Sequence, residues 1–381
     1  MRPWERRYVC DRCGVVVEPD AVVWRCECGG LFVFQYAEVQ IPVDQLARRP
    51  TTLWRYGEAL PFAPASTAPA RVTMGEGWTP LVDIDVSVGN GVEGRTVKAK
   101  IEYASPTLSF KDRGAVVLVA KALELGAQRL VADSSGNAGA AIAAYAARAG
   151  LPCDVFVARS TAPGKLAGMA AVGAGIRMVD GDREDVARAA ITEVQASRSF
   201  YASHVYNPFF FEGIKTLAFE LWEQLGRAPD VVVLPAGNGT LVLGTYRGFC
   251  ELERARLIER LPRILAVQAA ACAPLARAFH SHSMMVVPVV NEGTMADAIA
   301  IAEPARGDEI IDAVRVTRGT VVTVTDEEIM AAAGELARQG LYVEPTAAAP
   351  VAGLRRAQAD GWLDETASVV IPLCGAGLKA V

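Results

Sequence analysis

Short runs of β-branched and apolar residues alternate along this chain with longer segments rich in alanine and leucine. The apolar runs are typical of strands that are buried on both faces. They lie at residues 129–135, 153–158, 176–181, 230–237, 263–269 and 368–377. The segments between them have helical length, and residues 324–340 carry a capping box from Thr325 to Glu328 and a terminal Gly340. This alternation predicts α/β architecture with mostly parallel sheets.

Composition narrows the class of protein. The chain has 381 residues, 51% of them hydrophobic and 21% charged, which is enough for two globular domains. Its net charge is -5 and no basic stripe stands out, so we expect no nucleic-acid partner. Neither an apolar run of membrane-spanning length nor a signal peptide is visible, so we expect a cytoplasmic protein with no membrane partner.

Four of the eight cysteines cluster in the first thirty residues, at Cys10, Cys13, Cys26 and Cys28. In a cytosolic protein such clustering favours a metal site over disulfides. Two thiolate pairs on glycine-containing turns are typical of a zinc ribbon, although the second pair is Cys-x-Cys rather than Cys-x-x-Cys. The alternative is a small β module with reduced thiols.

Three of the predicted strands end in small polar residues, at the place where parallel sheets bind ligands. The run Ser-Ser-Gly-Asn at 134–137 precedes a helix and suits a carboxylate or phosphate, or simply caps the helix. The run Gly-Asn-Gly-Thr at 237–240 suits a phosphate, or forms a tight turn. Taken alone, Cys374 is a buried structural thiol.

A lysine in the stretch "SPTLSFKDRGA" (105–115) changes the weight of these features. Burial lowers the pKa of a lysine, which then forms a Schiff base with an aldehyde. Pyridoxal phosphate carries an aldehyde and a phosphate, so it needs a lysine, a phosphate loop and a partner for its ring nitrogen. Lys111 and the three strand ends together point to this cofactor.

Several motifs in one order extend this interpretation. "SPTLSFKDRGA", "SSGNA", "PAGNGT" and "CGAGLK" resemble the threonine synthase branch of the fold-type II pyridoxal-phosphate enzymes. "MGEGWTPL" (74–81), "NPFFFEGIKT" (207–216) and "LYVEPTAAA" (341–349) carry the resemblance over most of the chain, and the Cys-rich head is similar to the ribbon of many members. The resemblance implies two open, mostly parallel-sheet domains plus an N-terminal zinc-ribbon-like β module.

The resemblance also implies roles for single residues. Lys111 would hold the cofactor as a Schiff base and move the Cα proton, Asn137 would bind the cofactor's 3'-oxygen, and Cys374 would face the ring nitrogen. The substrate carboxylate would bind Ser134, Ser135 and Gly136, and the cofactor phosphate would bind Gly237, Asn238, Gly239 and Thr240. The implied domains are a ribbon (1–45), a large domain (46–112 and 221–381) and a small mobile domain (113–220), in a homodimer.

One segment departs from the family pattern. Threonine synthases bind O-phosphohomoserine, and their segment usually reads Asn-Pro-x-Arg-x-x-Gly with a serine two residues before the Asn. Here Phe210 and Val205 stand at those places, and Ala138 replaces the threonine that commonly follows the Asn of "SGN". Phenylalanine offers a phosphate nothing comparable to a bidentate arginine. The alternatives are a shifted alignment or a substitute cation, for which the candidates are Lys165, Arg247 and Lys215.

We therefore predict a pyridoxal-phosphate-dependent lyase or synthase that removes the Cα proton of an L-amino acid and expels a β or γ group. An unphosphorylated hydroxy-amino acid is the expected substrate, as in serine and threonine ammonia-lyases, whose corresponding segment resembles "TMADAIAIAEPARG" (294–307). One alternative is threonine synthase, which converts O-phospho-L-homoserine to L-threonine. Another is a catalytically silent scaffold that binds a partner. His204 lies near the altered segment, and a packing role is its default.

Overall fold

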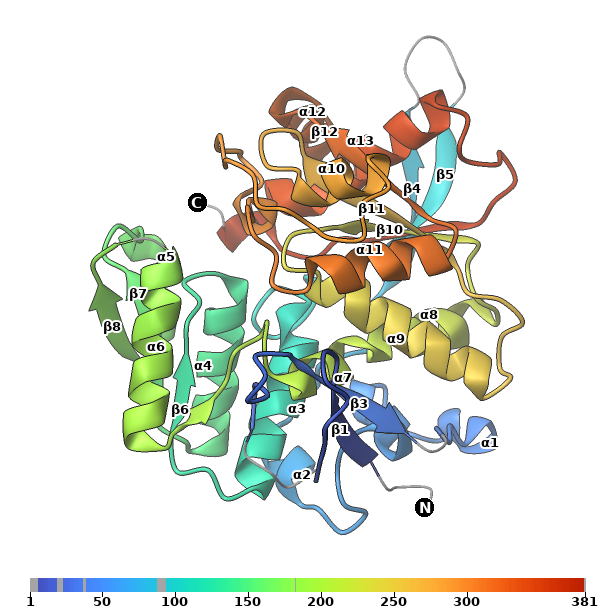
Figure 1. Cartoon of the computed structure of the whole chain (residues 1–381). Helices are drawn as coiled ribbons and strands as arrows, with labels where there is room; N and C mark the ends of the chain where they lie inside the picture. Colours follow the sequence, from blue (N-terminus) through green and yellow to red (C-terminus); the bar gives the residue numbers. More distant parts are fainter. Residues whose placement is uncertain (1–5, 19–22, 37–38, 88–93, 182, 380–381) are drawn as a thin grey trace. The chain divides into compact units, whose positions relative to one another are not determined.

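The computed structural model describes residues 6–18, 23–36, 39–87, 94–181 and 183–379 (Figure 1). The chain forms two compact units. The first contains residues 1–78 and 111–216, and the second contains residues 79–110 and 217–381. The predicted α/β fold with mostly parallel sheets and an N-terminal β module is confirmed. The three predicted domains and their boundaries stay a prediction.

The first unit combines a small antiparallel sheet with a parallel sheet and its helices. Its elements are β1 (Arg6–Cys10), β2 (Val16–Val17), β3 (Phe32–Tyr36), α1 (Val43–Leu46), η1 (Leu53–Ala59), α2 (Ala68–Val72), α3 (Lys111–Glu124), β6 (Leu130–Ala132), α4 (Asn137–Ala149), β7 (Cys153–Ala158), α5 (Pro163–Ala171), β8 (Gly175–Val179), α6 (Arg183–Ser197), β9 (Phe200–Tyr201) and α7 (Pro208–Ile214).

The strand order of its two sheets fixes where loops meet. The ribbon, residues 6–36, pairs its strands in the order β2-β1-β3. The other sheet runs β8-β7-β6-β9 and is wholly parallel. Val131 and Phe156 pack with side chains of α6, whereas a Cβ on Gly139 of α4 would lie 3.4 Å from Val155. Helices therefore cover both faces of this sheet (Figure 1). Residues 133–136 connect the carboxyl end of β6 to the start of α4.

The second unit is built on one larger sheet. Its elements are β4 (Leu81–Val86), β5 (Arg95–Lys100), α8 (Thr216–Leu225, whose first residue ends the first unit), β10 (Val231–Pro235), α9 (Thr240–Arg254), β11 (Arg263–Ala269), α10 (Pro274–His280), η2 (Asp297–Ile299), α11 (Gly307–Val316), β12 (Thr320–Val324), α12 (Asp326–Arg338), α13 (Pro345–Ala359), β13 (Val369–Pro372) and η3 (Gly377–Lys379).

This sheet runs β12-β11-β10-β13-β5-β4, with all pairs parallel except β4 with β5. All six predicted strands are present, and the predicted capping box begins α12. Strands β4, β5 and β12 of this sheet and β9 of the first unit were not predicted. Strand β5 has the polar sequence Arg-Thr-Val-Lys-Ala-Lys, which does not indicate a buried strand. Its last residue, Lys100, is nevertheless fully buried.

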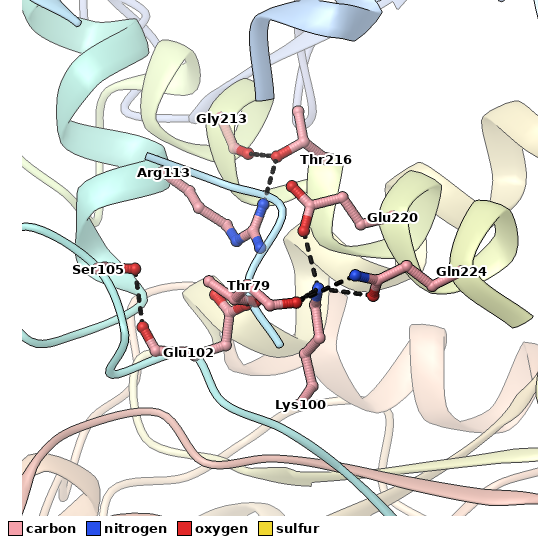
Figure 2. A network of polar contacts seen from close by, with 9 residues as sticks. All are labelled: Thr79, Lys100, Glu102, Ser105, Arg113, Gly213, Thr216, Glu220 and Gln224. Carbon is pink, nitrogen blue, oxygen red and sulfur yellow. Dashed lines mark hydrogen bonds and ion pairs between the residues drawn. The ribbon is translucent and has the colours of Figure 1, made fainter. Parts of the chain in front are cut away.

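That lysine is held by a buried polar cluster of the second unit (Figure 2). Lys100 Nζ donates to the carbonyl of Thr79 at 2.6 Å, to Glu220 Oε2 at 2.9 Å and to Gln224 Oε1 at 2.8 Å. Lys100 and Glu220 are both fully buried, so removing either one would leave an uncompensated charge at a cost of about 3–5 kcal/mol. The cluster thus fixes α8 to β5.

Candidate functional site

Lys111 is the first residue of α3 in the first unit. Its Nζ lies 5.7 Å from the centroid of the Phe210 ring. Phe210 is fully buried, and its ring occupies the space where a side chain on Gly114 would lie. Residues 111 and 114 are neighbours on one helix face. The structure therefore brings Lys111 and Phe210 together, and only a glycine at 114 permits it.

Helix α7, which carries Phe210, is fixed against the start of α3. Arg113 Nη1 donates to Thr216 Oγ1 at 3.1 Å, and this hydroxyl donates to the carbonyl of Gly213 at 2.7 Å (Figure 2). A Cβ on Gly213 would collide with the backbone of Arg113. The backbones of the two helices are thus in contact, and the position of Phe210 relative to Lys111 is rigidly defined.

His204 makes an edge-to-face contact with the Phe210 ring, with the two ring centroids 5.9 Å apart. It is 8% exposed, and its buried Nδ1 has no hydrogen-bond partner within the described part of the chain. Burial, and then the charges of Lys111 and Arg183, lower the pKa of His204 well below its usual value. At neutral pH the side chain is therefore an uncharged imidazole. Val205, beside it, is also buried.

Two charged residues of this region were not found from the sequence. Arg183 Nη2 lies 2.7 Å from Asp133 Oδ2, and Asp133 is 1% exposed. The other carboxylate oxygen, Oδ1, is buried without a hydrogen-bond partner among the described residues. Asp133 directly precedes Ser134 at the carboxyl end of β6, and this position in the sequence could have identified it as a candidate site residue. Arg183 is distant in sequence and gave none.

The run at 134–137 lies where it was predicted, between β6 and α4. Gly136 is the N-cap of α4, and no side chain caps this helix. Ser134 and Ser135 are partly exposed, whereas Ala138 is buried in the first turn. A 13-residue helix with an uncapped N-terminus beside two hydroxyls suits a carboxylate.

The second unit presents a similar helix start, which we call the phosphate loop (Gly237–Thr240). It connects β10 to α9, a 15-residue helix that no side chain caps. Gly239 has φ +76°, and a Cβ there would collide with Ile310. A Cβ on Gly237 would lie 2.8 Å from the carbonyl of Ala298. Positions 237 and 239 must therefore lack side chains, and backbone N–H groups exposed in this way suit the phosphate of pyridoxal phosphate.

Cys374 follows β13, the neighbour of β10, so it lies at the same edge of the sheet as the phosphate loop. It is 2% exposed. Its Sγ lies 3.9 Å from Glu344 Oε1, and the adjacent Gly375 leaves no room for a side chain beside that carboxylate. The backbone N–H of Phe110, the residue before Lys111, donates to the Cys374 carbonyl at 3.0 Å. The donor set of this unit, a bare loop and a thiol, fits the cofactor.

The four ribbon cysteines come together as a separate site. Their Sγ atoms all lie within 4.8 Å of one another, with Cys10 and Cys28 3.4 Å apart and Cys13 and Cys26 3.7 Å apart. A tetrahedral zinc with Zn–S bonds of about 2.3 Å separates its sulfurs by roughly 3.8 Å. Despite the opposing effect of burial, hydrogen bonds from neighbouring backbone and thiols lower the pKa of Cys10 to about 7. Contacts with the other thiols, by contrast, raise the pKa of Cys13 and Cys26, so the case for a metal rests on the sulfur geometry. The site therefore fits zinc.

Two of the candidate substitute cations form ion pairs that the structure defines. Lys215 Nζ lies 2.6 Å from Glu212 Oε2 in a fully buried pair, and Arg247 pairs with Glu309. Lys165 is exposed on α5. In the first unit, the positive charges that lower the pKa of His204 are those of Lys111 and Arg183.

Comparison with known proteins decides the family. The family profile described as "Pyridoxal-phosphate dependent enzyme" matches residues 72–375. The chain belongs to the pyridoxal-phosphate-dependent enzymes. It is 36% identical to the threonine synthase of Methanocaldococcus jannaschii over 97% of this chain and 92% of that protein. It is 38% identical to the threonine synthase of Mycobacterium tuberculosis over 87% of this chain and 89% of that protein.

Solved structures agree on the fold of this pyridoxal-phosphate-dependent enzyme. Maize serine racemase aligns with a TM-score of 0.67 and 20% identity over 81% of this chain and 92% of that one. The threonine deaminase of T.th. aligns with a TM-score of 0.66 and 25% identity over 78% and 92% of the two chains. The predicted fold type II, lyase class and cofactor are thus confirmed. No helix in the described ranges is long and apolar enough to cross a membrane.

Proposed function

We propose that this enzyme catalyses the reaction of threonine synthase, in which O-phospho-L-homoserine and water give L-threonine and phosphate. The similarity to named threonine synthases over 97% of the chain, ribbon included, carries this proposal. It favours the alternative in our sequence analysis over the ammonia-lyase that we predicted first. The specific substrate is the part of the proposal that needs testing.

Lys111 is proposed to hold the cofactor covalently and to carry the proton that leaves and returns to the substrate. Pyridoxal phosphate, when bound, withdraws electrons from the Cα of an amino acid and so makes its proton removable. Lys111 is partly buried at the start of α3, with its Nζ 5.7 Å from the centroid of the Phe210 ring, and its amine is the group that this covalent and proton-transfer chemistry requires.

The remaining family positions are proposed to bind and orient. The N–H groups of the phosphate loop would hold the cofactor's phosphate, Asn137 its 3'-oxygen, and Cys374 would face its ring nitrogen. Ser134, Ser135 and Gly136 would hold the substrate carboxylate at the N-terminus of α4. The uncapped starts of α4 and α9 and the bare backbone at Gly239 support these roles.

A second candidate has one specific observation in its favour. A buried phenylalanine at 210, with Val205 beside a neutral His204, gives the neighbourhood of Lys111 an uncharged wall. Such a wall suits an unphosphorylated hydroxy-amino acid, which would be converted to a 2-oxo acid and ammonia. If a phosphate is bound instead, Arg183 is our candidate for its cation, because it is 43% exposed and its partner Asp133 directly precedes Ser134 at the carboxyl end of β6.

Borohydride reduction tests the shared core of both candidates. Reduction of the cofactor-loaded protein should add the cofactor's mass to the peptide that contains Lys111, and phosphate release from O-phospho-L-homoserine should require that lysine. An unmodified Lys111 in a colourless protein would instead support the catalytically silent scaffold. We also propose that Cys10, Cys13, Cys26 and Cys28 hold one zinc, which metal analysis of the purified protein would measure. A homodimer stays a prediction.

A further inference from the structure

The ribbon packs directly on the segment that carries Val205 and Phe210. Tyr8 of β1 and Phe34 of β3 contact the ring of Phe209, with centroids 5.4 Å and 5.2 Å apart. Tyr8 is fully buried and Phe209 is 2% exposed. The next residue, Phe210, packs on Gly114 of α3. Successive residues of α7 therefore contact the ribbon and the helix of Lys111.

A third ribbon residue, Trp24, packs against the turn before α7. The ring of Trp24 lies 4.9 Å from Tyr201 and 5.6 Å from Tyr206, measured between centroids. Trp24 also packs against the cluster of Val131 and Phe156 in the core of the parallel sheet. It stands two residues before Cys26, so the thiol site and this ring belong to one short loop.

The braced turn contains both residues of interest. His204 and Val205 lie between Tyr201 and Tyr206 in the sequence, in a turn that is neither helix nor strand. Within the turn, Asn207 donates to the carbonyl of Tyr201 at 3.1 Å and accepts from the N–H of Phe209 at 3.1 Å. These bonds shape the turn, whereas the aromatic contacts connect it to the ribbon. Residues 201–211 are thus held between the ribbon and α3.

We propose that the ribbon positions the 201–211 segment through Trp24 and Tyr8, and thereby sets the enzyme's affinity for its amino-acid substrate. Neither side chain touches substrate in this account. They act through Tyr201, Tyr206 and Phe209, so they are positioning residues. The proposal rests on the proposed function only in assigning the 201–211 segment to the substrate side chain.

The test compares full-length, cofactor-loaded variants by steady-state kinetics and amide hydrogen exchange. Trp24→Ala removes two aromatic pairs, so we expect KM for the amino acid to rise about tenfold. We expect kcat to change less than KM, and the amides of residues 201–211 to exchange faster. Trp24→Phe should restore most of both properties. Trp362→Ala is the matched control, because that ring stacks under Arg263 in the second unit, and it should change neither.

A folded Trp24→Ala protein with unchanged exchange over residues 201–211, or with an unchanged KM, would overturn the proposal. If that variant does not fold, Trp24→Phe against the wild type decides by the same two readouts, with smaller changes in the same direction. If the wild type turns over no amino acid, both the proposed function and the proposed effect of the ribbon on substrate affinity are wrong. The exchange comparison would still decide whether the ribbon orders the segment.

Discussion

The phosphate loop of the second unit and the 201–211 segment of the first unit, which we propose to bind cofactor and substrate respectively, are built differently. The loop uses backbone: Gly239 has a positive φ, and side chains at 237 or 239 would collide with their surroundings. The segment instead presents side chains, among them the buried Phe210 and Val205. The comparison indicates that a cofactor bound by backbone would depend on the fold, whereas a substrate bound by side chains would depend on a few replaceable residues.

The largest effect should come from Lys111, which we propose to hold the cofactor. We expect Lys111→Ala to lower the turnover rate by roughly a thousandfold or more, because it removes both the covalent attachment and the proton carrier. The absorbance band of the bound cofactor should shift as well. Lys98→Ala is the control, since that lysine forms an exposed pair with Asp83 at 2.8 Å. Retained turnover without Lys111 would contradict its central role.

A side chain in the phosphate loop should have the next largest effect. We expect Gly239→Val to weaken cofactor binding by at least about tenfold, because it combines a strained φ with a collision against Ile310. Equilibrium titration with pyridoxal phosphate measures this. Gly168→Ala on α5, where a Cβ has open space, should leave the affinity unchanged. Equal affinities in the two variants would mean that the loop does not hold the cofactor.

The third prediction addresses the side chains of the first unit. If Arg183 supplies the missing positive charge, Arg183→Ala should slow phosphate release from O-phospho-L-homoserine about tenfold. Its effect on L-serine or L-threonine should be smaller. Arg159→Ala, which breaks an exposed pair with Asp180 on the same unit, serves as the control. The same loss on every substrate would show a structural role for Arg183 rather than phosphate recognition.

The smallest effect concerns pH and His204. Its pKa in the folded protein lies below the value of about 6.5 expected after unfolding, so the unfolded chain binds the proton more tightly. This contribution to stability is complete above pH 6.5 and is lost as the pH falls below it. Between pH 7.5 and 5.5 we expect the wild type to lose about 1 kcal/mol more unfolding free energy than His204→Asn. Denaturant titrations of both proteins at the two pH values measure this difference. Equal losses of unfolding free energy would mean that His204 takes up a proton in the folded protein as readily as in the unfolded chain.

The sequence predicted those features that local patterns determine. The apolar runs predicted the buried strands, and the glycine-rich run at 237–240 predicted a bare loop at a strand end. Strand β5 could not be predicted, because its buried Lys100 is compensated by Glu220, 120 residues away. Likewise, Arg183 meets Asp133 and Trp24 meets Tyr201 only through tertiary packing. The residue pairs around the proposed substrate segment could therefore be found only in the structure, whereas the cofactor could be predicted from the sequence.

The comparison between the two regions depends on which amino-acid substrate the 201–211 segment binds. The most direct test is mass spectrometry of the cofactor-loaded enzyme incubated with L-serine, L-threonine and O-phospho-L-homoserine together. Our account predicts newly formed L-threonine and phosphate at the expense of O-phospho-L-homoserine. A 2-oxo acid and ammonia, with O-phospho-L-homoserine untouched, would contradict it and show that Phe210 has ended phosphate recognition.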